Sequence, residues 1–204
     1  MEEKEALQIF NEVGAIITDG HFVYASGKHG KVYINKDAIY PRTAHICRLC
    51  YAIAEKFAND NINVVAAPAV GGVILSQWVA HFLSQIDGYE VLSIYAEKSE
   101  DSSFVFRRGY NKLISGRNIL VVEDVITTGN SVKKVIEAVR VAGGNVVGVG
   151  ALCNSAQVTA QDIGNVPRLR SLVNMKLDTW DLSQCPLCKQ NIPINTEFGR
   201  GNHF

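Results

Sequence analysis

Two adjacent carboxylates, Glu123 and Asp124, directly follow the apolar run Ile119–Val122. Such a run is typical of a buried strand, and open α/β sheets bind ligands at the carboxyl ends of their strands. Carboxylates accept hydrogen bonds from hydroxyl groups. The pair could therefore hold the vicinal hydroxyls of a sugar at this edge of a sheet.

A short loop after the acids has the composition of an anion site. It contains, in order, Val125, Ile126, Thr127, Thr128, Gly129, Asn130 and Ser131, and it leads into a predicted helix. Glycine lets the backbone approach a ligand, and N–H groups at the start of a helix favour an anion. A simpler interpretation, in which one hydroxyl caps the helix, leaves the second acid and the other hydroxyls unexplained. We therefore favour a sugar-phosphate site.

The elements that must position these residues alternate along the chain. The spacing of apolar residues predicts helices over 3–17, 43–58, 73–83 and 131–141, and strands over 22–24, 32–35, 64–67, 91–95, 118–122 and 146–152. Residues 96–112 are polar and charged without a period, as expected of a functional loop. Alternating strands and helices predict an α/β fold with a mostly parallel sheet covered on both faces. Beyond residue 160 the pattern weakens, and we expect an extension that wraps the core.

The composition excludes several classes of protein. The chain has 204 residues, 47% of them hydrophobic, and its 20 basic residues balance its 20 acidic ones. A neutral chain of this size predicts one globular domain without nucleic-acid binding. The sequence has no apolar run long enough for a membrane span, and its start, Met1–Glu5, is acidic, unlike a signal peptide. We expect a cytoplasmic protein with reduced thiols and no membrane partner.

The segment Ile119–Ser131 resembles the phosphoribosyl pyrophosphate signature of type I phosphoribosyltransferases. Over nearly the whole chain the resemblance extends to orotate phosphoribosyltransferases. Further motifs that carry it are the Ser-Gly turn Ser26–His29 followed by Tyr33 and Ile34, the loop Pro68–Gly72, the segments Ala96–Lys98 and Arg107–Gly109, and the tail motif Cys185–Cys188.

The resemblance implies a fold and an activity. The fold is the type I phosphoribosyltransferase fold in a single domain, 1–204, with a hood made by about 1–40 and the extension 160–204. The activity transfers phosphoribose from phosphoribosyl pyrophosphate to orotate, giving orotidine 5′-phosphate and pyrophosphate in pyrimidine biosynthesis. It also implies a homodimer and Mg²⁺ held mainly by the substrate.

The resemblance also implies roles for individual residues. Glu123 and Asp124 would hold the ribose hydroxyls, and Thr127–Ser131 would grip the 5-phosphate. Val125 and Ile126, between the acids and this loop, would also bind substrate. Backbone at Val70 and Gly71 would face the pyrophosphate. Lys98 would close over the pyrophosphate, across the dimer in this family, with Arg107 or Arg108 assisting. Tyr33 and Ile34 would contact the base, and Ser26 and Lys28 of the Ser-Gly turn would also bind substrate.

Three positions depart from the family pattern. Ala25 and Gly71 stand where basic residues are common, and Asn154-Ser155 stands where Asp-Arg is usual, the arginine being thought to hold the orotate carboxylate. We expect Lys28 to replace it, with Lys31 and Lys36 as alternatives. Two other functions stay open: transfer to a purine, xanthine or uracil, and a non-enzymatic sensor of phosphoribosyl pyrophosphate that regulates transcription or RNA. The neutral charge disfavours the regulator.

Two Cys-x-x-Cys pairs raise the question of a zinc site. Cys50 of the pair Cys47/Cys50 falls on the apolar face of a predicted helix, which favours core packing. Cys185 and Cys188 follow a turn and enclose a proline, so they are the better candidate ligands. Of the histidines, only His29 in the Ser-Gly turn has a predicted site role.

Overall fold

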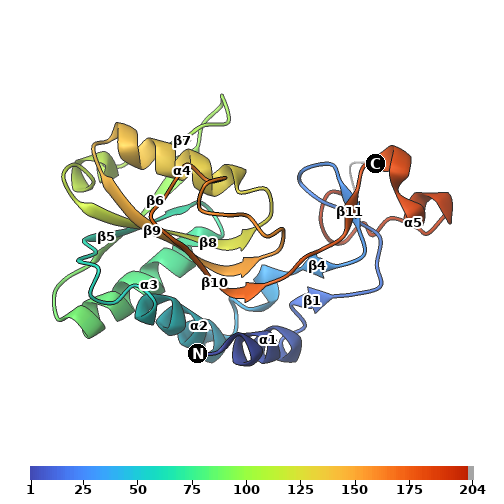
Figure 1. The fold of residues 1–204 in the computed structure, drawn as a ribbon, viewed down its shortest axis with the longest axis horizontal. Coiled ribbons are helices and arrows are strands. Elements are labelled where there is room, and N and C mark those ends of the chain that lie inside the picture. The colour runs from blue at the N-terminus through green and yellow to red at the C-terminus, as the bar shows by residue number, and fades with distance from the viewer. Residues whose placement is uncertain (202–204) are drawn as a thin grey trace.

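A six-stranded sheet forms the centre of the computed structural model, which describes residues 1–201 (Figure 1). Its strand order is β10-β9-β8-β5-β6-β7, and all neighbours are parallel except β7, which runs antiparallel to β6. The strands are β5 (Val64–Pro68), β6 (Leu92–Lys98), β7 (Phe104–Val105), β8 (Asn118–Ile126), β9 (Asn145–Asn154) and β10 (Leu169–Asn174). The predicted α/β fold with a mostly parallel sheet is confirmed.

Helices cover both faces of the sheet, as predicted. Three of them, α1 (Glu3–Glu12), α2 (Thr43–Glu55) and α3 (Gly72–Asp87), bury their apolar residues in one cluster with Val65 and Ala67. The fourth, α4 (Asn130–Val141), packs on the other face with Val64 and Ala66. Successive residues of β5 point to opposite faces, so this strand needs apolar side chains at every position.

A smaller lobe lies beside the sheet, and we call its residues 20–34 and 177–201 the hood (Figure 1). It is built from both ends of the chain, because β11 pairs with β3 and β3 with β2. The remaining short elements are β1 (Ile16–Ile17), β2 (Phe22–Val23), β3 (His29–Gly30), β4 (Tyr33–Ile34), η1 (Lys36–Ala38), η2 (Tyr110–Leu113), β11 (Thr179–Trp180), η3 (Leu182–Gln184) and α5 (Pro186–Lys189). Of the C-terminal extension, β10 belongs to the central sheet. The single-domain assignment 1–204 stays a prediction.

Three expectations about elements were wrong. The first helix ends at Glu12 rather than at residue 17, because Gly14 has a φ of +69° and Ile16–Ile17 pairs with β4. The segment 96–112 is not irregular throughout: β6 continues to Lys98 and forms a hairpin with β7. The strand predicted over 118–122 runs on to Ile126, so both acids lie inside it.

No helix among residues 1–201 combines the length and the apolar character needed to cross a bilayer.

Candidate active site

The side chains of the two acids of β8 line two different cavities. Consecutive strand residues point to opposite faces, and accordingly Asp124 lines a large cavity beneath the hood while Glu123 lines a small one at the start of α4. Both side chains are buried. The adjacent pair therefore reaches two compartments at once.

Asp124 is held by two residues that follow β4. Its Oδ2 atom lies 3.0 Å from Lys36 Nζ and accepts a hydrogen bond of 3.2 Å from the Tyr40 hydroxyl. Gly71 leaves room for this arrangement, since a Cβ atom there would lie 2.2 Å from Asp124 Oδ2 and 2.9 Å from Lys36 Nζ. The loop after β5, the segment after β4 and the end of β8 thus meet at one point.

These contacts shift the pKa values of the groups around Asp124. Burial and the neighbouring Asp124 charge raise the pKa of Glu123 well above the ordinary glutamate value. Burial alone would lower the pKa of the Lys36 ammonium, but the charge of Asp124 and its hydrogen bond outweigh burial and raise it. Burial, and then the Asp124 charge, raise the pKa of Tyr40. Lys36 is therefore a cation and Tyr40 a hydrogen-bond donor at neutral pH.

The loop after β8 forms the small cavity. It has a volume of about 30 Å³ and is lined by Glu123 and by residues 125–132. Gly129 precedes α4 with a φ of +75°, and a Cβ atom there would come within 2.7 Å of Ile163. Thr127, Thr128 and Ser131 are exposed. Hydroxyl groups and the first N–H groups of a twelve-residue helix thus surround a space of the kind that binds a phosphate.

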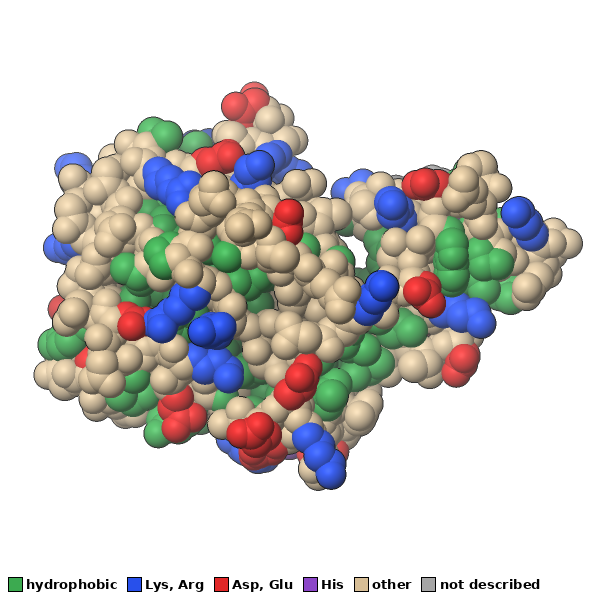
Figure 2. Space-filling view, in the orientation of Figure 1, with side chains coloured by type: hydrophobic (Ala, Val, Ile, Leu, Met, Phe, Trp, Pro, Cys, Tyr) green, Lys and Arg blue, Asp and Glu red, His purple; other side chains and the backbone are tan. Residues whose placement is uncertain are grey.

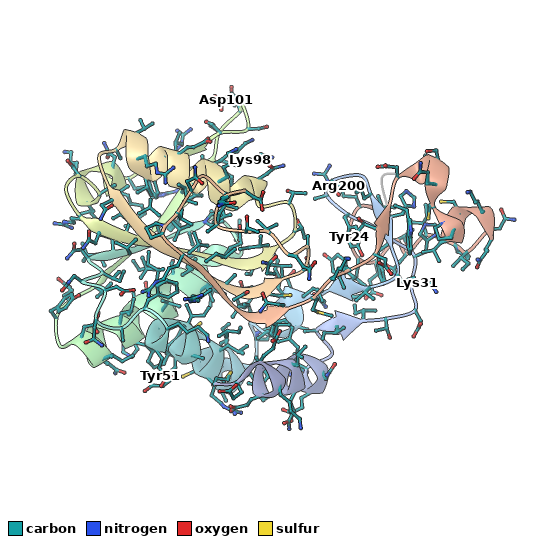
Figure 3. All side chains as sticks on the ribbon, viewed as in Figure 1. Tyr24, Lys31, Tyr51, Lys98, Asp101 and Arg200 are labelled. Atoms are coloured by element: carbon teal, nitrogen blue, oxygen red, sulfur yellow. The ribbon has the colours of Figure 1, made fainter. Side chains whose placement is uncertain are left out.

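The large cavity lies between the sheet and the hood and has a volume of about 360 Å³. That volume suits a small ligand. The sheet side contributes Asp124, Val125, Thr127 and Ser155. The side toward the hood contributes Tyr24, Ala25, Tyr33, Ile34, Lys36, Leu177, Gly199 and Arg200. Figure 2 shows the opening between the two parts, and Figure 3 shows Tyr24 and Arg200 on the hood with Lys98 on the core side.

The C-terminal segment reaches the cavity through a close backbone contact. Gly199 has a φ of +76°, and a Cβ atom there would lie 2.4 Å from the carbonyl oxygen of Val23. The next residue, Arg200, donates its backbone N–H to that carbonyl at 2.8 Å. The Phe198 ring stacks on Tyr33 with centroids 5.7 Å apart. Glycine at 199 is thus needed for Arg200 to lie beside the cavity.

The structure brings only some of the predicted residues into these cavities. Tyr33, Ile34, both acids and the loop 125–131 line one cavity or the other. Lys98 is exposed at the end of β6, and Arg107 and Arg108 form ion pairs with Glu97 at 3.5 and 3.0 Å. Ser26 and Lys28 are exposed in the Ser-Gly turn, and Val70 is 86% exposed.

The sequence interpretation missed Arg200 and named Lys36 only as an alternative. Among the described residues, these are the two basic side chains that line the large cavity. The signal for Lys36 was its place next to the Tyr33-Ile34 pair. Arg200 follows a stretch without periodicity, so no pattern placed it near residue 24. Ser155, at the position of the missing arginine, is buried and donates its hydroxyl to the carbonyl of Ile126 at 3.2 Å.

Comparisons with known proteins agree with this geometry. A family model described as phosphoribosyl transferase domain matches residues 35–184. The orotate phosphoribosyltransferase of Caldanaerobacter subterraneus is 40% identical over 196 residues, which cover 95% of this chain and 96% of that protein. That of Desulforamulus reducens is 37% identical over 193 residues, covering 95% of each.

Solved structures show the same fold. The orotate phosphoribosyltransferase of Mycobacterium tuberculosis gives a TM-score of 0.66 at 23% identity, covering 84% of this chain and 95% of that one. An adenine phosphoribosyltransferase from Thermoanaerobacter pseudethanolicus gives 0.64 at 14% identity, covering 85% and 99%. The matched domain spans most of the chain, and full-length relatives share more than a third of its residues. The chain therefore belongs to the phosphoribosyltransferase family and has its type I fold.

Proposed function

We propose that this chain transfers phosphoribose from phosphoribosyl pyrophosphate to orotate, giving orotidine 5′-phosphate and pyrophosphate in pyrimidine biosynthesis. The observation that carries the proposal is the likeness to orotate phosphoribosyltransferases over almost the full length of both chains. The cavities support it, because an acid pair separates an anion-binding loop from a space large enough for a base.

Phosphoribosyl pyrophosphate would lie across the end of β8. The loop Thr127–Ser131 would hold the 5-phosphate with hydroxyl and backbone donors. Glu123 and Asp124 would accept hydrogen bonds from the ribose hydroxyls. Ionised acceptors make stronger hydrogen bonds than neutral ones, and Asp124 is buried, where such bonds are worth more.

The pyrophosphate side needs positive charge, because the C1–oxygen bond breaks as the new C1–nitrogen bond forms and leaves charge on pyrophosphate. We infer that Lys36 provides it. Its Nζ lies 2.9 Å from the position that a Cβ atom at Gly71 would take, so its ammonium group lies beside the loop that would face the pyrophosphate. Mg²⁺ would neutralise further charge. Since Lys36 and Tyr40 already occupy Asp124 Oδ2, oxygens of the substrate and water would be its main ligands.

Lys98 would act on closure, together with Arg107 or Arg108. It is exposed at the end of β6, where the hairpin to β7 begins, and lies outside the large cavity, so it would reach bound substrate only when this hairpin moves. We also propose a homodimer in which Lys98 serves the partner's site. Mixing Lys98→Ala with Asp124→Asn chains tests this, because only a shared site regenerates activity in the mixture. If the two variants stay inactive after their chains have been mixed and allowed to exchange, Lys98 acts in the site of its own chain.

The orotate carboxylate would pair with Arg200. A guanidinium holds a carboxylate in a two-point geometry that fixes the plane of the base. Arg200 lines the large cavity from the hood, opposite Ser155. Tyr24, Tyr33 and Ile34 provide the flat and apolar contacts that a pyrimidine ring needs. This arrangement replaces the cation that is missing at position 155.

The reaction is tested by incubating the protein with phosphoribosyl pyrophosphate, Mg²⁺ and one base at a time, and measuring pyrophosphate release. We expect turnover with orotate, and far less with uracil, which lacks only the carboxylate. Turnover of a purine, xanthine or uracil in place of orotate would refute the base assignment. Binding of phosphoribosyl pyrophosphate without turnover of any base would favour the regulator instead.

The base contact is tested by comparing Arg200→Gln with Lys28→Gln. A charge-assisted hydrogen bond contributes roughly 1.5–3 kcal/mol, so losing the partner of the carboxylate should raise the KM for orotate about 10- to 150-fold. The KM for phosphoribosyl pyrophosphate should change little. If Lys28→Gln shows the large effect and Arg200→Gln does not, the turn lysine holds the carboxylate.

A further inference from the structure

Four potential metal ligands from the two ends of the chain meet inside the hood. They are His21, His29, Cys185 and Cys188, and their ligand atoms all lie within 4.8 Å of one another. The first three are buried and Cys188 is half-buried. His29 lies in β3, His21 directly precedes β2, and the two cysteines follow β11, so the pairing of β3 with β2 and β11 brings the segments that carry them together.

Three sulfur–nitrogen distances match the edges of a tetrahedral zinc site. Cys188 Sγ lies 3.5 Å from His29 Nδ1 and 3.7 Å from His21 Nε2, and Cys185 Sγ lies 3.7 Å from His21 Nε2. Bond lengths of about 2.3 Å to sulfur and about 2.0 Å to nitrogen give a sulfur–nitrogen edge of about 3.6 Å in a tetrahedron. The two ring nitrogens are 2.7 Å apart, so the imidazoles would separate by about half an ångström to reach the tetrahedral edge.

The His21 ring is already oriented for coordination. Its Nδ1 lies 2.7 Å from the carbonyl oxygen of Ile192. A carbonyl only accepts, so Nδ1 carries the hydrogen, and the lone pair of Nε2 points at the cluster in the neutral ring. A backbone carbonyl that accepts from the outer nitrogen is the usual support of a metal-bound histidine.

The other Cys-x-x-Cys pair provides a contrast. Cys47 and Cys50 lie on α2, where Cys50 is fully buried in the apolar core. Within residues 1–201, the hood cluster is the one group of three or more candidate ligands. Cys185 and Cys188 flank the start of the short helix α5, and the spacing Cys-x₂-Cys is typical of zinc-binding turns.

We propose that His21, His29, Cys185 and Cys188 bind one Zn²⁺ as a structural site. Four protein ligands fill the tetrahedral coordination shell and leave no position for water or substrate, which separates this site from the chemistry at β8. Its role is to join the start of the hood to its end. The same C-terminal segment continues to Gly199 and Arg200, so the ion would hold the wall of the large cavity in place.

The test is the metal content of protein purified without chelator from cells supplied with zinc. We expect one zinc per chain that survives gel filtration. After removal of zinc with a chelator, Co²⁺ should bind and give the strong absorption of tetrahedral cobalt with thiolate ligands. Both readouts are independent of enzymatic activity. Zinc-free protein that also binds no Co²⁺ through sulfur would overturn the proposal.

Variants locate the site. Cys188→Ser and His21→Gln should lose stoichiometric zinc, whereas Cys47→Ser, from the second pair, should retain it. Chelation should lower the melting temperature of the wild type and of Cys47→Ser and leave that of Cys188→Ser unchanged. Full zinc content in Cys188→Ser would overturn the assignment even if His21→Gln failed to fold. So would a Cys185–Cys188 disulfide, found by mass analysis of the unreduced protein as the dominant species.

Discussion

Replacing Lys36 by methionine tests the contact that joins the segment after β4 to the acid of β8. Methionine has nearly the same length and leaves no cavity, so the change removes mainly the charge. At 3.0 Å and an effective dielectric constant of about 20, the attraction between Lys36 and Asp124 is about 5–6 kcal/mol. Desolvation and the one-third exposure of Lys36 offset much of this, and a charged hydrogen bond contributes a net of about 1.5–3 kcal/mol.

The burial of Asp124 determines whether Lys36→Met stabilises or destabilises the fold. Lys36→Met leaves Asp124 buried beside Glu123 without its cation, and removal of one partner of a buried pair is destabilising. We expect the free energy of unfolding to fall by about 1.5–3 kcal/mol, which corresponds to roughly 3–12 °C in melting temperature for a chain of this size.

The assay is urea unfolding of the ligand-free protein, with Lys31→Met as the matched control, since Lys31 is exposed and does not line the cavity. Adding Asp124→Asn to Lys36→Met should restore part of the lost stability. If Lys36→Met were as stable as Lys31→Met, the ion pair would make no net contribution and the reasoning would fail.

Four further outcomes are expected. Asp124→Asn should fold but lose most turnover at saturating substrate; near-normal activity would show that this acid does not hold the ribose. Lys98→Ala should lower kcat far more than it weakens binding of phosphoribosyl pyrophosphate, measured by calorimetry, because its contact forms on closure. Gly71→Ala should cost about 1–3 kcal/mol in thermal unfolding, since its methyl would displace Asp124 and Lys36. The pKa of Glu123 is raised in the folded state. The free energy of unfolding should therefore fall as the pH rises from the ordinary glutamate pKa of about 4.3 through the raised pKa. Glu123→Gln should lack this fall when unfolding is measured at pH 5 and pH 8.

The sequence predicted the core of the fold well, because buried parallel strands and amphipathic helices leave strong local patterns. Ile119–Val122 and the helix after Asn130 are such cases. Strand ends were predicted less well. In the sequence, Glu123 and Asp124 directly follow an apolar run, yet pairing of β8 with β9 continues to Ile126 and determines the face to which each acid points. The end of β8 is therefore set by its pairing with β9, which the residues of β8 alone do not show.

The parts of the site that join distant segments were not predictable from local patterns. Arg200 reaches the cavity through the contact of its backbone with Val23, and nothing in its own segment shows a period. His21 and Cys185 are 164 positions apart, so the spacing rules that identified the two cysteines could not supply the two histidines. A single sequence reveals such groups only once strand pairing is known.

The hood also constrains the order of folding. His21 bonds to the carbonyl of Ile192, 171 positions away. Closing a flexible loop of that length costs about 4–5 kcal/mol in chain entropy. We expect the short strands of the hood alone to contribute less stabilisation than this. A folded central sheet holds the two segments near each other and removes most of that cost. The sheet should therefore form first, and the wall of the large cavity that Gly199 and Arg200 provide should be completed only in a late step of folding.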